Sequence, residues 1–272
     1  MTITKVPART GRIERSGLVL VVFLIAAGSW LGLAFLHGDQ GHVASSAPSH
    51  ELEHHGSHSA AWAGSSLTGS LRWVSGWVLM VVAMMLPPAL PLLRVVRRLV
   101  ATRRSPAVLV AATATAFIGV WTAAGAVLLV IGTLPGMLSV GWDWLQAHPR
   151  ASTGTAAIIA GGYQFTSWKN ACLTACRSPL GLAMTTWTGT RRPLVEASLI
   201  GARFGMVCVG CCWALMLLTM SVGAFALPVM VFGAVLMSLE RLVPQVRPLV
   251  PIIATAAICF GVLNLAVVLQ WS

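Results

Sequence analysis

The stretch "MVCVGCCWALMLLTM", residues 206–220, contains no charged residue and lies within a longer apolar run, Leu199 to Val222. A run of this length matches the roughly 20 residues that an α-helix needs to cross a bilayer. Three cysteines fall between positions 208 and 212, and Met216 and Met220 follow at four-residue steps. The stretch therefore predicts a membrane-crossing helix with sulfur atoms along one side.

The rest of the chain has the same apolar character. Of its 272 residues, 57% are hydrophobic and only 9% are charged, and the mean hydropathy is +0.82. Soluble proteins carry about 25% charged residues. We therefore predict an all-α membrane protein, a single bundle of about seven transmembrane helices, with six to seven as the range. The predicted spans are Ser16–Leu36, Trp73–Leu93, Ala107–Leu134, Ser152–Trp168, Leu199–Val222, Ala224–Leu239 and Leu249–Trp271.

The basic residues indicate how this bundle is oriented. With the N-terminus in the cytoplasm, every one of the 18 Lys and Arg residues except Arg72 and Arg150 falls in a cytoplasmic segment. The positive-inside rule therefore predicts a cytoplasmic N-terminus and an outer C-terminus. This orientation and attraction to anionic membrane lipid account for the net charge of +11, so we expect no nucleic-acid partner.

The first span follows a basic segment, which is also typical of a secretory signal. Its 21 residues exceed the apolar core of about 7–15 residues that such signals have, so we expect an uncleaved anchor. Cleavage near "VASSAPS", residues 43–49, is the alternative.

A polar segment, residues 37–72, separates the first two spans and is too poor in large apolar residues to form a core. It contains six of the seven histidines. Neutral imidazole binds zinc, copper and nickel. His50, His54 and His58 would share one face of a helix, with His55 beside them. We expect a flexible outer loop that captures a divalent metal, and a solvated linker is the alternative.

The second predicted span contains prolines and methionines near its cytoplasmic end. Pro87, Pro88 and Pro91 lack a backbone donor, so we expect a break or kink there. Met84 and Met85 precede the prolines, and thioether sulfur is a soft ligand that favours Cu(I). Methionine also fills gaps in apolar cores, which is the alternative for both residues.

Five of the six cysteines form two groups with ligand-like spacing. Cys172 and Cys176 lie four residues apart, so a helix would present both thiols on one face. The second group consists of Cys208, Cys211 and Cys212, which fall within a sector of about 100° on one helix face, and Met216 extends this face. Metal ligation is the favoured interpretation, because cytoplasmic thiols stay reduced. Packing and thiol–disulfide exchange are the alternatives.

Few charged residues lie near these cysteines. Lys169, Arg177 and Arg203 are close to them in sequence and are expected to lower cysteine pKa values. Three charged residues lie near cytoplasmic span ends, where we expect them to act as interfacial anchors: Glu196, Arg203 and Glu240. The sequence contains no Walker A motif, H-E-x-x-H motif or nucleophile elbow, so we do not expect ATP-driven pumping by this chain alone, and a role that is not enzymatic is favoured.

Four segments together resemble one bacterial family, described as predicted metal-binding integral membrane proteins and sometimes called copper chaperones. They are "MMLPPALPLL" (84–93), "GGYQFTSWKNACLTACRSPL" (161–180), "CVGCCWALM" (208–216) and Glu240 followed by a basic residue. The resemblance covers roughly Trp73 to Pro244 and does not include the histidine loop. It implies metal-associated roles for Cys172, Cys176, Cys208, Cys211 and Cys212, with Met84 and Met85 as neighbouring candidates.

These observations lead to one functional hypothesis and a division of the chain. We expect a multi-pass protein of the bacterial inner membrane that binds a soft transition metal, copper as Cu(I) or else zinc, for metal handling. A metal-handling protein is the expected partner. The alternatives are a membrane thiol oxidoreductase and a structural partner of a membrane complex. The parts are a tail and anchor (1–36), the histidine loop (37–72), a metal-binding membrane domain (73–248) and a last helix (249–272).

Overall fold

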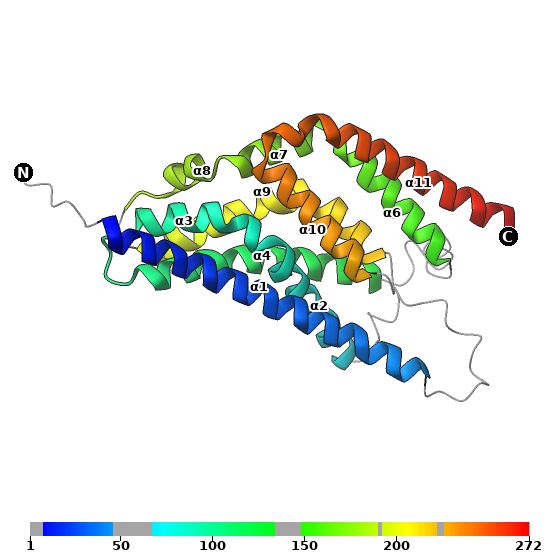
Figure 1. Cartoon of the computed structure of the whole chain (residues 1–272), viewed down its shortest axis with the longest axis horizontal. Coiled ribbons are helices and arrows are strands. Elements are labelled where there is room, and N and C mark those ends of the chain that lie inside the picture. The colour runs from blue at the N-terminus through cyan, green and yellow to red at the C-terminus, as the bar shows by residue number, and fades with distance from the viewer. Residues whose placement is uncertain (1–7, 46–66, 134–147, 190–191, 222–225, 272) are drawn as a thin grey trace, which may run out of the picture.

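The computed structural model describes residues 8–45, 67–133, 148–189, 192–221 and 226–271, and these residues contain helices and no strand. The helices form an elongated bundle, with the α6 and α11 pair at one end (Figure 1). In chain order they are α1 (Ala8–Ser45), α2 (Leu67–Met85), the 3-10 helix η3 (Pro87–Ala89), α3 (Leu90–Leu99), α4 (Pro106–Thr133), α6 (Pro149–Gln164), α7 (Ser167–Arg177), α8 (Pro179–Thr186), α9 (Pro193–Ser221), α10 (Ala226–Leu242), η5 (Pro244–Leu249) and α11 (Val250–Trp271).

Each of the seven predicted spans overlaps helical residues, but the second is divided between α2, η3 and α3, and the fourth runs past the end of α6 into α7. The helices also differ in their capacity to cross a membrane. Among the described residues, four helical segments are long and apolar enough: Gly17–Phe35, Pro106–Leu128, Pro193–Ser221 and Val250–Gln270. The bent pair α2 and α3 brings the number to five if it counts as one span. The prediction of about seven is therefore supported only in part. Helices α6 and α10 have 16 and 17 residues, fewer than the roughly 20 that a perpendicular crossing needs.

The predicted break in the second span is confirmed. Helix α2 ends at Met85, η3 contains Pro87 and Pro88, and α3 continues at an angle of 51° to α2. The prolines supply no backbone donor, so the continuous i to i−4 ladder cannot pass through them. The bend turns α3 away from the axis of α2 and toward α4 and α8.

Helix α9 is the central element of the bundle and packs against α4, α6, α7, α8 and α10. Glycines permit its close approach to α4. A Cβ added at Gly201 would collide with the carbonyl oxygen of Thr113, and one added at Gly205 would lie 3.0 Å from the Val120 Cβ. Small residues at such crossings are typical of helix packing inside membranes.

Helices α6 and α11 pack against each other through backbone contacts. A Cβ added at Gly161 would lie 2.6 Å from the Ala254 carbonyl oxygen and 2.7 Å from Ile258 Cγ1. A Cβ added at the next residue, Gly162, would meet no atom of another helix within 4 Å. These adjacent glycines in the same helix therefore differ in packing alone.

Substituting these two glycines by alanine is expected to give opposite results. Gly161→Ala should destabilise the protein by about 1–3 kcal/mol, because the extra methyl forces α6 from α11. Gly162→Ala should be neutral or stabilise it by about 0.4–1 kcal/mol, because alanine reduces the entropy of the unfolded chain. Thermal unfolding of the purified protein in detergent measures both. Equal shifts in Tm would contradict the close packing.

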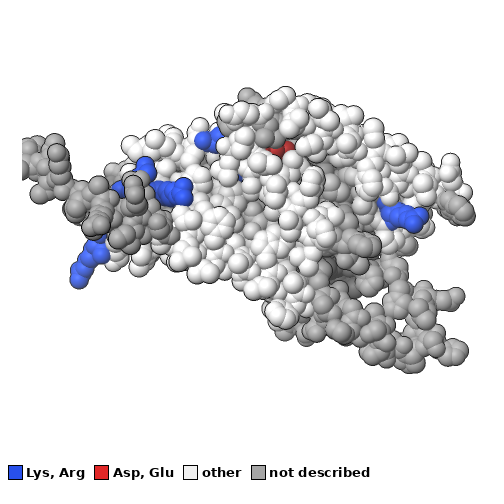
Figure 2. Space-filling view, viewed as in Figure 1, with Lys and Arg blue, Asp and Glu red and all other residues white. Residues whose placement is uncertain are grey.

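The charged side chains are unevenly distributed along the bundle. Figure 2 shows most of the visible basic groups at the end where α3 terminates, and a wide uncharged surface beside them. Arg97 and Arg98 lie in the last turn of α3, and Arg103 and Arg104 follow it. This end of the bundle matches the arginine-rich segment that the sequence assigned to the cytoplasm.

Candidate metal centre

Three helices, α7, α9 and α10, meet around the predicted cysteines. Thr166 caps the N-terminus of α7, where its side chain accepts a hydrogen bond of 3.2 Å from the Lys169 backbone amide. The helix ends at Arg177, and Pro179 begins α8. The predicted helical placement of Cys172 and Cys176 is thus confirmed, although α7 is a separate helix and not an extension of α6.

Four of the five predicted cysteines form one buried cluster, which we call the sulfur cluster: Cys176, Cys208, Cys211 and Cys212. The Sγ atoms of Cys176 and Cys211 are 3.6 Å apart, and those of Cys211 and Cys212 are 3.3 Å apart. Cys208 is fully buried beside them. The fold of α7 against α9 therefore unites the two sequence groups.

A cation lies inside the sulfur cluster. The Nη2 atom of Arg241, on the last turn of α10, is 2.6 Å from the Sγ of Cys208, 3.2 Å from that of Cys212 and 3.4 Å from that of Cys211. The side chain of Arg241 is 6% exposed. A guanidinium group stays charged in proteins, so the cluster surrounds a permanent positive charge.

Cys172 lies beside the sulfur cluster and packs against the backbone of α9. A Cβ added at Gly210 would stand 2.8 Å from the Cys172 Sγ, so a glycine is needed there for α7 to approach. Burial raises the pKa of the Cys172 thiol above its usual range, and the nearby Cys211 adds to this effect. Cys259 is exposed on α11.

Aromatic residues enclose the sulfur cluster. The Nε1 of Trp121 donates to the Cys208 Sγ at 3.2 Å, and the Nε1 of Trp77 donates to the Trp121 carbonyl at 2.8 Å. The hydroxyl of Tyr163 donates to the Gly210 carbonyl, and its ring contacts the edge of Trp213. These contacts hold α4 and α6 against the cysteine-bearing part of α9.

A buried ion pair joins α7 to α10. Lys169 Nζ lies 2.7 Å from the Oε2 of Glu240, and both side chains are 2% exposed. Gln164 Nε2 donates to the other carboxylate oxygen at 3.3 Å. Arg177 Nε donates to the Glu240 carbonyl oxygen at 3.0 Å and so caps the end of α10. This network holds Cys176 on α7 close to Arg241 on α10.

The sequence-based roles of the charged residues are wrong in two respects. Glu240 is an internal partner of Lys169 and not an interfacial anchor. Glu196 is also buried, where its carboxylate accepts bonds from the Thr188 and Gly189 amides.

The cation nearest to the cysteines was also missed. Arg203 donates to the Thr186 hydroxyl, and Arg177 and Lys169 bind Glu240. Among the described residues, Arg241 is the cation that contacts the sulfur atoms. The one indication of Arg241 in the sequence was its place directly after Glu240, in the motif of an acidic residue followed by a basic one.

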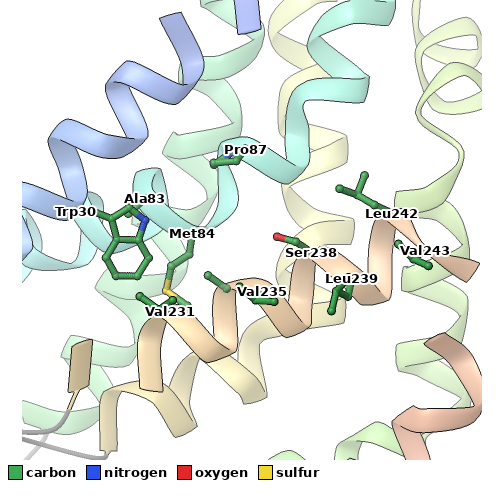
Figure 3. A pocket seen from close by; sticks show the side chains of 11 residues that line it. Trp30, Ala83, Met84, Pro87, Val231, Val235, Ser238, Leu239, Leu242 and Val243 are labelled. Atoms are coloured by element: carbon green, nitrogen blue, oxygen red, sulfur yellow. The ribbon is translucent and has the colours of Figure 1, made fainter. Parts of the chain in front are cut away.

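The predicted methionines are buried, but they lie at different distances from the sulfur cluster. Met84 lines a cavity of about 430 Å³ between α1, α2 and α10 (Figure 3). A Cβ added at Gly233 would lie 3.6 Å from the Met84 methyl and 3.7 Å from that of Met237, which sequence reasoning missed. Gly233 precedes Arg241 by two helical turns, about 12 Å along α10.

Met216 lies one turn beyond Cys212 on α9 and is fully buried, as is Met85 at the end of α2. Both therefore belong to the apolar core around the sulfur cluster. The histidines predicted to capture metal, His50, His54, His55 and His58, lie outside the described residues.

The sulfur cluster has the donor chemistry of a soft-metal site, although the thiols are not arranged as a closed coordination sphere. Within the described residues, no group of three or more His, Cys, Asp or Glu side chains is positioned to hold a metal ion. The sulfur atoms surround Arg241 Nη2. Thiolate sulfur prefers Cu(I), zinc and iron–sulfur clusters among the biological metals.

Comparison with known proteins supports this interpretation. Searches of curated proteins and of solved structures found no match. The sequence matches the family PpoB2, described as "Copper chaperone", over residues 74–264, a segment that contains all five predicted cysteines. Because the match covers more than half of the chain, this protein belongs to the PpoB2 family of copper chaperones.

Proposed function

We propose that this chain is an integral membrane protein that binds Cu(I) at the sulfur cluster for copper handling. The observation that carries the proposal is the convergence of Cys176 on α7 with three cysteines of α9 in one buried place. The family description supports copper as the metal. Zinc, which also binds thiolates, is the alternative metal.

The membrane part of the proposal follows from helix length and charge. The four long apolar helices would cross the bacterial inner membrane, and the bent pair α2 and α3 would form a fifth, broken span. The arginine-rich end of α3 would face the cytoplasm with the N-terminus, in accordance with the positive-inside rule.

The methionines and histidines would extend the copper path in this scheme. Met216, Met84 and Met85 would serve as soft accessory ligands on the outer side of the sulfur cluster. His50, His54, His55 and His58 would collect metal in the outer loop. A metal-handling protein would exchange copper with this chain.

A thiol oxidoreductase is less well supported. The 3.6 Å separation of the Cys176 and Cys211 sulfur atoms would allow a disulfide after a small movement. However, both thiols are buried, 6% and 1% exposed, so a partner thiol could not attack either of them in this arrangement. Metal binding needs the entry of one ion only.

Metal analysis of the purified protein tests the proposal. After expression in copper-replete medium and purification in detergent without oxygen, we expect about one copper per chain, because one cluster of thiolates binds one soft ion. Elemental analysis measures copper and zinc in the same sample. Protein that contains neither metal would contradict the proposal, and zinc alone would contradict the choice of copper.

A further inference from the structure

The position of Arg241 raises the question of how a metal reaches the sulfur atoms. A buried cation needs nearby negative charge or hydrogen-bond acceptors. The adjacent carboxylate, Glu240, is already paired with Lys169 at 2.7 Å. The acceptors that the structure provides for Arg241 are the sulfur atoms themselves, at 2.6–3.4 Å from Nη2.

The guanidinium and a metal ion need the same space. A metal–thiolate bond is about 2.3 Å long, so an ion bonded to the sulfur atoms of α9 would overlap Nη2, which touches the same three atoms. We propose that Arg241 is a resident cation that Cu(I) displaces: the ion takes the place of the guanidinium at the sulfur atoms, and each thiol that becomes a ligand releases its proton to solvent. This inference rests on the proposed function, because it concerns the same sulfur cluster.

The hydrogen bonding of Arg241 is consistent with a side chain that can leave. Its Nε and Nη1 atoms are buried and have no hydrogen-bond partner among the described residues. Buried donors without partners are unfavourable, so the present position of the guanidinium is incompletely stabilised. An arginine with all its donors bonded would be much harder to displace.

The place of Arg241 in the fold makes a withdrawal short. The residue lies in the last turn of α10, which ends at Leu242. Leu242 is 54% exposed, so the surface is one residue away along the helix. Rotation of the Arg241 side chain alone would open the sulfur atoms while Glu240 stays paired with Lys169.

The exchange predicts that Arg241 controls the rate of copper loading. If the open arrangement is populated to about 10% or less, removing the guanidinium should accelerate loading about tenfold or more. The probe is the Cu(I)–bicinchoninate complex, whose colour fades as copper transfers to the detergent-purified protein in an anaerobic stopped-flow experiment. Wild-type loading should level off at high probe concentration, because withdrawal of Arg241 becomes limiting.

The variants are Arg241→Gln, Arg241→Lys and, as a matched control, Arg203→Gln, which removes an exposed arginine of α9 that binds Thr186. Arg241→Gln should load fastest, Arg241→Lys at an intermediate rate, and Arg203→Gln like the wild type. Equal rates for Arg241→Gln and the wild type would overturn the inference.

If Arg241→Gln does not fold, the dependence of the wild-type loading rate on probe concentration tests the displacement of Arg241 by itself. A loading rate that rises in proportion to the probe over its whole range would show that no displacement limits entry, and would overturn the inference. The proposed function would survive that result, because copper is still bound. Failure of the wild type to take up copper would instead contradict the proposed function.

Discussion

Replacing Cys208, Cys211 and Cys212 together by serine is expected to abolish copper binding. The three thiols contact one another or share Arg241 at the centre of the sulfur cluster. A serine hydroxyl is a hard ligand and does not hold a soft ion. Copper content should fall by about tenfold or more relative to the wild type, since even loss of an outer-shell partner costs 10–100-fold in affinity. Elemental analysis after identical purification measures the difference.

The control for the triple variant is Cys259→Ser. Cys259 is exposed on α11, apart from the sulfur cluster, so its removal should leave the copper content unchanged. The elution profile of each variant in detergent checks that it is folded. A triple variant that is folded and retains copper would assign the cysteines to packing, and would place the metal elsewhere in the chain.

The helical architecture was predictable because the membrane signal is strong and local. Runs such as Leu199–Val222 and Leu249–Trp271 contain enough apolar residues to indicate a helix without knowledge of its neighbours. The kink at Pro87 was predictable for the same reason, because it depends on the covalent structure of proline.

The number of spans was not predictable in the same way. A hydropathy pattern does not determine where a helix ends. Gln164 ends α6 and leaves it at 16 residues, before the turn that leads to Thr166 and α7. That turn is stabilised by the Thr166 cap and by the packing of α7 on α9, a contact between distant segments.

The grouping of the cysteines in the candidate site was predictable, but the charged residues around them were not. Cysteine spacing identified both groups, since two helices each present thiols on one face. Whether the two groups meet depends on Gly210, which lets Cys172 and α7 approach the backbone of α9. Arg241 could not be assigned, because its contacts with the cysteines cross 29 to 33 positions of the sequence.

The structure also separates two kinds of internal charge. The pair of Lys169 and Glu240 is satisfied on both sides and fixes the helices. Arg241, the next residue, has two donor atoms without a partner and sulfur as its acceptor within the part of the chain that the structure describes. Glu240 therefore fixes α10 against α7, whereas its neighbour Arg241 is a replaceable cation. This combination is suited to a site that must open without unfolding.

Breaking the ion pair between Lys169 and Glu240 is expected to cause a large loss of stability. Replacing Glu240 by leucine should destabilise the protein by about 3–5 kcal/mol, because the buried Lys169 ammonium loses its counter-charge. Lys169→Leu should cost a similar amount, since it leaves the Glu240 carboxylate unpaired. Thermal unfolding in detergent measures both variants. Each should also lower copper content, because α7 and α10 separate and Cys176 moves from the sulfur cluster.

The double variant Lys169→Leu/Glu240→Leu distinguishes a charge effect from a packing effect. With both charges removed, two apolar side chains face each other, and such replacements are often close to neutral. The double variant should therefore be more stable than either single variant, with a coupling of at least about 1 kcal/mol in the double-mutant cycle. Losses that simply add would mean that the ion pair does not hold α7 to α10. Recovered stability with recovered copper content would tie the sulfur cluster to this contact.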